Sequence, residues 1–156
     1  MKFSNKIILI LLFIFCCLYK AQKPNIGQPT LIECSTYTSD NTINKYVGNW
    51  TGNINGKSMT LILKKEKIMS PNSTKCYDDI VVFHQYMSND IEIEDSTNFS
   101  NTTYLEGKST GLGYTKNNNE NILILNISHK SKNKVVKAFI SYIDATHLKI
   151  DKIENL

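Results

Sequence analysis

The sequence contains no arginine, so all 18 of its basic residues are lysines. Arginine recognises phosphate and guanine through two parallel hydrogen bonds, and its absence excludes that mode of nucleic-acid recognition. The formal net charge is +4, but Lys2, Lys6 and Lys20 lie in a segment that we expect to be removed. The remaining chain carries 15 lysines against 14 acidic residues. Because a clustered positive charge is missing, nucleic acid is not an expected partner.

Long hydrophobic runs are almost absent, and the one that occurs is short. Ile7 to Leu18 is a stretch of twelve residues without a charge, and two lysines precede it. A membrane-spanning helix needs about 20 apolar residues, so this run predicts a cleavable signal peptide over residues 1–21. Cleavage is expected between Ala21 and Gln22. The mature protein would then be periplasmic, outer-membrane-associated or extracellular, without a transmembrane span.

Cysteine is scarce, with four in the chain. Cys16 and Cys17 end the apolar run, but lipid-modified cysteines usually follow a small residue, and Phe15 precedes Cys16. We therefore do not expect a lipid anchor.

The two remaining cysteines, Cys34 and Cys76, predict a disulfide, because an exported protein matures in an oxidising compartment. No Cys-x-x-Cys motif or neighbouring histidine pair indicates zinc, so no metal ligand is assigned. Closing a loop of about 40 residues would stabilise the fold by about 4 kcal/mol in the loop-entropy description. Two free thiols, one of them catalytic, are the alternative.

Helical periodicity is missing from the mature chain, and proline is rare. Residues 22–44 contain two of the three prolines and little pattern, which predicts an extended N-terminal segment. From Lys45 onward, short apolar runs alternate with clusters of Asn, Gly, Ser and Lys, the pattern of strands joined by hairpins. We expect residues 45–156 to form one all-β domain of about seven or eight strands, an antiparallel up-and-down barrel or strongly curved sheet.

Side-chain alternation locates the individual strands. The first spans 46–54, and the Asn55-Gly56 pair that follows suits the positive φ angles of a type I′ turn. The second alternates from Met59 to Leu63 and is expected to end in the lysine-rich stretch 64–67. The centre of strand 77–87 is apolar on both faces, which predicts a central, doubly covered strand. Further strands are expected at 91–94, 122–128, 135–143 and 147–153.

The expected core consists of large apolar residues from these strands: Trp50, Leu61, Leu63, Phe83, Ile122, Ile124, Phe139 and Leu148. Residues 95–116 are expected to form a long loop with one irregular strand, because their aromatic residues are scattered among Ser, Thr, Asn and Gly. The tyrosines and Phe99 of this segment could line a ligand mouth, although packing in the core and rim is the favoured role.

Three runs of the sequence resemble one known family in the same order: YVGNWTGNINGKSMTLILKKEKI, YDDIVVFHQYMSNDIEIEDS and FISYIDATHLKI. From Lys45 to the C-terminus the chain resembles a family of small secreted Bacteroidota proteins, of the type of domain of unknown function 6705. The resemblance implies a lipocalin-like β fold and supplies no activity. The Gly48-x-Trp50 element is also similar to the opening strand of lipocalins, in which the tryptophan closes one end of the barrel.

The three histidines do not point to a catalytic or metal site. His84, His129 and His147 lie on three different predicted strands, and a site would require them to converge. Strand alternation favours surface positions for them.

Two acidic stretches, Asp78-Asp79 and Glu92-x-Glu94-Asp95, offer the paired carboxylates of a glycosidase. Such a pair must lie about 5 to 9 Å apart across a cleft. Because these residues flank predicted turns, we interpret them as solvated charges that keep the sheet edges from pairing with other molecules.

The sequence therefore predicts an exported, non-enzymatic β-barrel protein, without a cofactor, that binds a small apolar ligand or a protein partner. No catalytic or ligand-binding residue is assigned. Two alternatives remain, a hydrolase of envelope material with carboxylates at the barrel mouth, and a purely structural envelope protein. The hydrolase requires two acidic residues that face one cleft, whereas ligand binding requires a deep apolar cavity.

Overall fold

The computed structural model describes residues 33–116 and 119–156. The predicted signal peptide lies outside the described residues, together with its cleavage point between Ala21 and Gln22 and with Cys16 and Cys17. Within the described ranges, no helix has the length and apolar character that crossing a bilayer requires.

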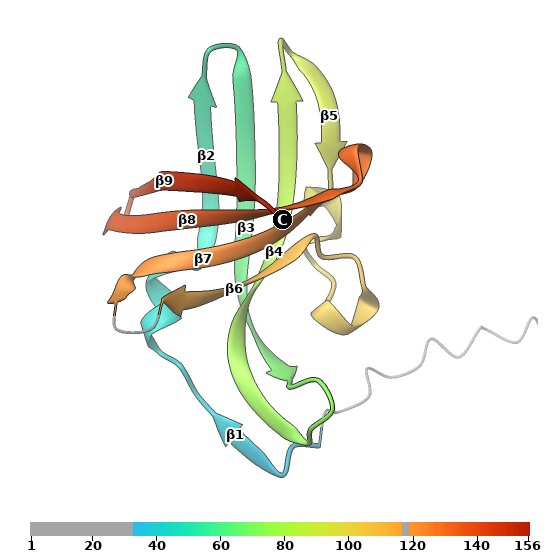
Figure 1. Ribbon diagram of the computed structural model, residues 1–156, viewed down its shortest axis with the longest axis vertical. Coiled ribbons are helices and arrows are strands. Elements are labelled where there is room, and N and C mark those ends of the chain that lie inside the picture. The colour runs from blue at the N-terminus through green and yellow to red at the C-terminus, as the bar shows by residue number, and fades with distance from the viewer. Residues whose placement is uncertain (1–32, 117–118) are drawn as a thin grey trace, which may run out of the picture. The chain divides into compact units, whose positions relative to one another are not determined.

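Strands make up most of the described residues, and the helices among them are short 3₁₀ turns (Figure 1). The strands are β1 (Thr36–Thr38), β2 (Gly48–Ile54), β3 (Lys57–Met69), β4 (Lys75–Ser88), β5 (Ile91–Asp95), β6 (Gly111–Lys116), β7 (Asn119–His129), β8 (Lys134–Asp144) and β9 (His147–Asn155). The 3₁₀ turns are η1 (Thr42–Tyr46), η2 (Thr97–Phe99), η3 (Tyr104–Glu106) and η4 (Lys130–Lys132). The all-β prediction is confirmed, and β1 is the strand that it did not include.

All these strands belong to one sheet, with the order β2-β3-β4-β6-β7-β8-β9. β1 and β5 lie off this path, and both pair with β4. The β1–β4 pairing is parallel, and the others are antiparallel. In Figure 1 the strands β2 to β4 run along the long axis of the view and β6 to β9 cross them, so the sheet folds over itself. The predicted barrel-like, strongly curved sheet is confirmed, although no pairing joins β2 to β9 in the described part of the chain.

Strand β4 is the centre of this arrangement. One edge pairs with β3 over nearly its whole length, from Cys76 opposite Met69 to Ser88 opposite Lys57. The other edge is shared by β1 at 75–77, β6 at 80–82 and β5 at 85–88. The middle of the strand, Ile80 to Phe83, has no exposed surface. The prediction of a central strand covered on both faces is confirmed.

Apolar side chains pack on both faces of β4, because successive residues of a strand point to opposite sides. The larger cluster, which we call the inner core, lies inside the curved sheet and includes Leu61 and Leu63. The smaller cluster lies on the outer face around Phe83, and Tyr104 of the irregular segment 95–116 packs against it. All three of these strand residues were expected in the core, and all three are buried.

The core prediction is wrong in phase for β7 and β8. Ile122, Ile124 and Phe139 were expected inside. Ile124 is buried as expected, with 8% exposure, but the inner core receives Leu123 and Leu125 from β7. The three expected residues lie on the opposite face of the same strands. β7 is apolar at consecutive positions, so a period of two fits either face and alternation alone cannot choose between them.

The predicted turn between the first two strands is confirmed. Asn55 and Gly56 have φ angles of 49° and 70°, as a type I′ turn requires. β3 does not end in its lysine-rich stretch, however, and continues to Met69. Two of the lysines in this stretch have acidic partners, with Lys64 Nζ 3.3 Å from Glu66 and Lys65 Nζ 2.8 Å from Asp78.

The described part of the expected N-terminal segment belongs to the folded unit, which begins at Glu33. Cys34 and Cys76 form a disulfide with Cα atoms 5.6 Å apart, beside the pairing of β1 with β4. Further along, η1 places Ile43 and Tyr46 in the inner core, where both are almost fully buried. The Tyr46 hydroxyl donates a hydrogen bond to the Glu120 carbonyl over 3.0 Å. Through Ile43 the segment 22–44 therefore contributes to the core and is more than an extended tether.

We predict that Gly111→Ala destabilises the protein by about 2 kcal/mol, because a Cβ at this position would collide with the backbone carbonyl of Asn126 on β7. Gly52→Ala on β2 is the matched control, since a Cβ there meets nothing within 4 Å. Urea unfolding of the two variants measures both effects. Equal stability of the Gly111→Ala and Gly52→Ala proteins would contradict the close approach of β6 to β7.

Candidate functional site

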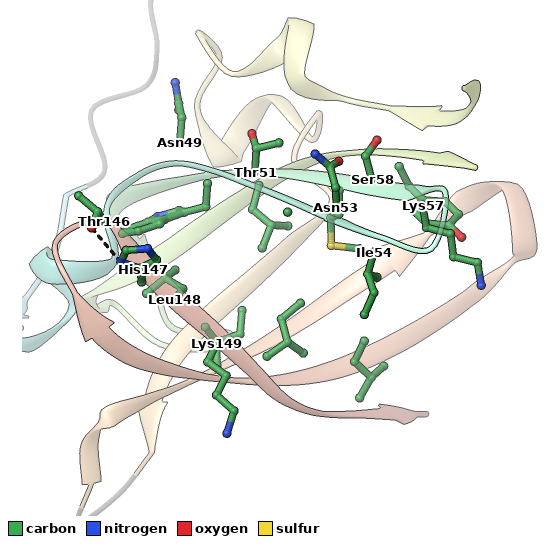
Figure 2. Close-up of a pocket in the computed structure, with 18 residues that line it drawn as sticks. Asn49, Thr51, Asn53, Ile54, Lys57, Ser58, Thr146, His147, Leu148 and Lys149 are labelled. Carbon is green, nitrogen blue, oxygen red and sulfur yellow. Dashed lines mark hydrogen bonds between the residues drawn. The ribbon is translucent and has the colours of Figure 1, made fainter. Parts of the chain in front are cut away.

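A cavity of about 800 Å³ opens between β2 and β9, the two end strands of the sheet path. Its walls come from β2, β3 and β9, from the turn between β8 and β9, and from Tyr86 of β4 and Ile140 of β8 (Figure 2). We call it the β2–β9 cavity. It lies where, in the part of the chain that the structure describes, no strand pairing closes the curved sheet.

Nine of the eighteen lining residues are aliphatic or aromatic: Trp50, Ile54, Met59, Leu61, Tyr86, Ile140, Leu148, Ile150 and Ile153. The strand register explains their common orientation, because cross-strand partners lie on the same face of a sheet. Three such pairs are Trp50 with Leu61, Met59 with Tyr86, and Ile140 with Ile150. In a closed barrel these residues would continue the inner core, whereas here they border an open space.

Several lining residues remain exposed to solvent. Ile54 is 71% exposed, Ile150 46% and Ile153 55%. Single exposed apolar residues are common on protein surfaces, but an apolar group gathered in a concave site is the usual sign of a binding site.

The inner end of the β2–β9 cavity is built from residues that also touch the inner core. Trp50, Met59 and Leu148 line the cavity and pack against that core. The Trp50 indole is fixed by a hydrogen bond from Nε1 to the carbonyl of Tyr46 over 2.8 Å. The expectation that Trp50 and Leu148 belong to the core therefore holds in part, since each is half-buried at the boundary between core and cavity.

Polar residues of β2 and β3 face away from the opening. In Figure 2 the side chains of Asn49, Thr51, Asn53 and Ser58 point to the opposite side of the hairpin from Ile54. This is the alternation expected of strands with one solvent-exposed face. Among the described residues, the lining contains no aspartate or glutamate, and its basic residues are Lys57, His147 and Lys149.

The histidine prediction needs correction, because two of the three histidines converge. His84 and His129 both approach Glu94, with His129 Nδ1 at 2.7 Å and His84 Nε2 at 3.8 Å from its carboxylate. The His84 side chain is 2% exposed, and its Nδ1 lies 2.8 Å from the Thr110 hydroxyl. His147 is separate and exposed, as expected. The sequence pattern missed the burial of His84 because its partners come from distant parts of the chain.

The Glu94 cluster has a structural explanation. Burial raises the pKa of Glu94, but the backbone N–H groups of Lys130 and Ser131, together with the two histidines, outweigh it and hold the pKa below its usual value. These N–H groups belong to the turn between β7 and β8, so the carboxylate fastens that turn to β5. Burial lowers the pKa of His84, which favours the neutral ring. Within the residues described, no three side chains of His, Cys, Asp or Glu form a metal site.

Asp78 and Asp79 were interpreted as solvated, and both are buried instead, with 8% and 5% exposure. Asp78 binds Lys65 Nζ at 2.8 Å and accepts hydrogen bonds from Tyr37, Ser39 and the Asp40 N–H. Burial opposes ionisation, but these donors bring its pKa down to about 2.

Asp79 has the opposite electrostatic environment. Burial raises its pKa to about 7, although it accepts the Ile80 N–H over 2.9 Å. Its cross-strand neighbour is Glu66, another carboxylate. Asp78 and Asp79 are consecutive on β4 and so point to opposite faces of the sheet, which prevents them from acting as one pair across a cleft.

The aromatic residues of segment 95–116 do not line the β2–β9 cavity. Tyr104 packs on the outer cluster, and Phe99 and Tyr114 are 39% and 46% exposed elsewhere. Packing rather than a ligand mouth explains Tyr104. The cavity uses the first hairpin and the last strand instead, and no local pattern shows that these two meet.

We predict that Asp79→Asn stabilises the protein, and does so by about 2 kcal/mol more at about pH 8 than at about pH 5. A carboxyl whose folded pKa is raised from 3.8 to about 7 binds a proton in the folded state that the unfolded state has lost. Native stability therefore falls as the pH rises through that window, and the amide removes this dependence. Urea unfolding at the two pH values measures it.

Asp78→Asn is the adjacent control, because it removes a favourable ion pair and lowers stability at both pH values. An Asp79→Asn protein whose stability changes with pH as the unaltered protein does would contradict the buried, protonated carboxyl.

Comparison with known proteins identifies a family and nothing closer. No curated protein and no solved structure matches the chain. A family model described as a family of unknown function, DUF6705, matches residues 1–155, nearly the whole sequence. The chain therefore belongs to this family of unknown function.

Proposed function

We propose that the protein is an exported, non-enzymatic binding protein that holds a small apolar ligand in the β2–β9 cavity. The observation that carries this proposal is the apolar lining, in which nine aliphatic or aromatic side chains surround about 800 Å³. Sites for small molecules are typically about 300 to 1,000 Å³ and mainly apolar. The cavity fits that class in both size and chemistry.

Ligand burial would remove an exposed apolar surface from water. Burying apolar surface contributes about 25 cal/mol per Å², so covering side chains such as Ile54, Ile150 and Ile153 is favourable. None of these three side chains belongs to the inner core or packs against it.

The hydrolase alternative finds no support at this cavity. A carboxylate pair across a cleft would need two acidic residues in the lining, and the described residues contribute none. The cationic and apolar wall favours binding over acid-base chemistry.

Export is supported by the disulfide between Cys34 and Cys76. Disulfides persist in the periplasm and outside the cell, whereas the cytosol keeps most thiols reduced. A predicted signal peptide and a disulfide point to the same compartments.

We predict that the neutral apolar dye N-phenyl-1-naphthylamine binds saturably at one site. Trp50 is the only tryptophan in the chain and lines the cavity, so quenching of its fluorescence reports binding directly. The double variant Ile54→Asn/Ile153→Asn is expected to bind about tenfold more weakly, because about 1.4 kcal/mol of apolar contact is lost.

Ile143→Asn on β8 is the control, since Ile143 is 57% exposed and does not line the cavity. Its affinity is expected to equal that of the unaltered protein. Linear, unsaturable binding, or equal weakening by the control, would count against the proposal.

A further inference from the structure

The β2–β9 cavity has charges of one sign at its border. Its basic residues are Lys57, His147 and Lys149, and no carboxylate among the described residues lines it. Two of the three lie beside acidic residues outside the lining. His147 Nδ1 lies 2.9 Å from Asp144, and Lys149 Nζ lies 2.9 Å from Asp151.

Lys57 differs from the other two in its partners. Within the described parts of the chain, its ammonium takes part in no ion pair, side-chain hydrogen bond or ring contact. It is therefore the lining cation whose charge is left for a ligand.

Lys57 also points toward the cavity, whereas Lys149 does not. Its cross-strand partner is Ile54, and Met59 follows two residues later on β3, so all three share one face. Figure 2 shows Lys57 on the same side of the hairpin as Ile54, and shows Lys149 directed away from the opening. The side chain thus offers an apolar stem to the cavity and an ammonium at its border.

Lys57 and Trp50 mark opposite ends of the β2–β9 cavity. Trp50 stands against the inner core, and Lys57 follows the turn at Asn55-Gly56. Trp50 and Ile54, the partner of Lys57, are four residues apart on β2, which is about 13 Å at the rise of a strand. The cavity is therefore long enough for an alkyl chain. Its end at Trp50 is apolar, and its end at Lys57 is charged.

We propose, resting on the proposed function above, that the ligand is a single-chain amphiphile with an anionic head. The alkyl chain lies along the lining toward Trp50, and a carboxylate or phosphate oxygen of the head accepts a charge-assisted hydrogen bond from Lys57 Nζ. A neutral ligand of the same chain gains only the apolar contact, and a cationic one meets the charge of Lys57.

Titration of Trp50 fluorescence with decanoate, decanol and decylammonium at low salt and about pH 7.5 tests this inference on the unaltered protein. Decanoate is expected to bind about tenfold more tightly than decanol, and decylammonium more weakly than either. Lys57→Gln is expected to make decanoate and decanol equal, and Lys57→Glu to reverse the order in favour of decylammonium. Lys152→Gln on β9 is the matched control, because Lys152 does not line the cavity, and it is expected to keep the original order.

The outcomes separate the two proposals. Saturable binding of decanol with no preference for decanoate would leave the apolar cavity as the binding site and overturn the anionic head. A preference for decanoate that survives Lys57→Gln would overturn the role of Lys57. If no compound of the series saturates, the proposed function itself fails.

Discussion

The backbone hydrogen-bonding groups on both edges of the buried strand β4 need partners, and the rest of the fold is arranged to supply them. β4 spans fourteen residues, and buried backbone N–H and C=O groups must find partners within the protein. β3 supplies them along one edge, but the second edge needs β1, β6 and β5 in succession. These strands come from three separate parts of the chain, so pairing with β4 fixes the positions of the N-terminal segment, the irregular segment 95–116 and β5.

The open side of the sheet follows from this arrangement. β6 pairs with β4 only over residues 80–82, so the strands that follow are free to cross the first ones rather than continue beside them. Gly111 has no Cβ and so lets the start of β6 lie close to the backbone of β7. The crossing half brings β9 opposite β2 without a shared ladder, and the space between them becomes the β2–β9 cavity.

Part of this structure could be predicted from patterns within short stretches of the sequence. The Asn55-Gly56 turn and the apolar centre of β4 need no knowledge of distant residues, and only one cysteine pair remained outside the predicted signal peptide. The burial of Asp78 and His84 depends on partners such as Lys65 and Thr110, which no local pattern reveals. The phase of β7 and the cavity were missed for a related reason, since both are decided by what lies opposite in space.

The charges along β9 have a consequence for self-association. End strands expose backbone groups that can pair with another sheet, and natural proteins protect them with charged side chains. β9 carries two ion pairs along its length, Lys149 with Asp151 and Lys152 with Glu154. A second copy that extended the sheet at this edge would have to strip water from these groups. The charged side chains of β9 thus disfavour the pairing of this strand with a second copy, so the opening of the β2–β9 cavity beside it stays accessible.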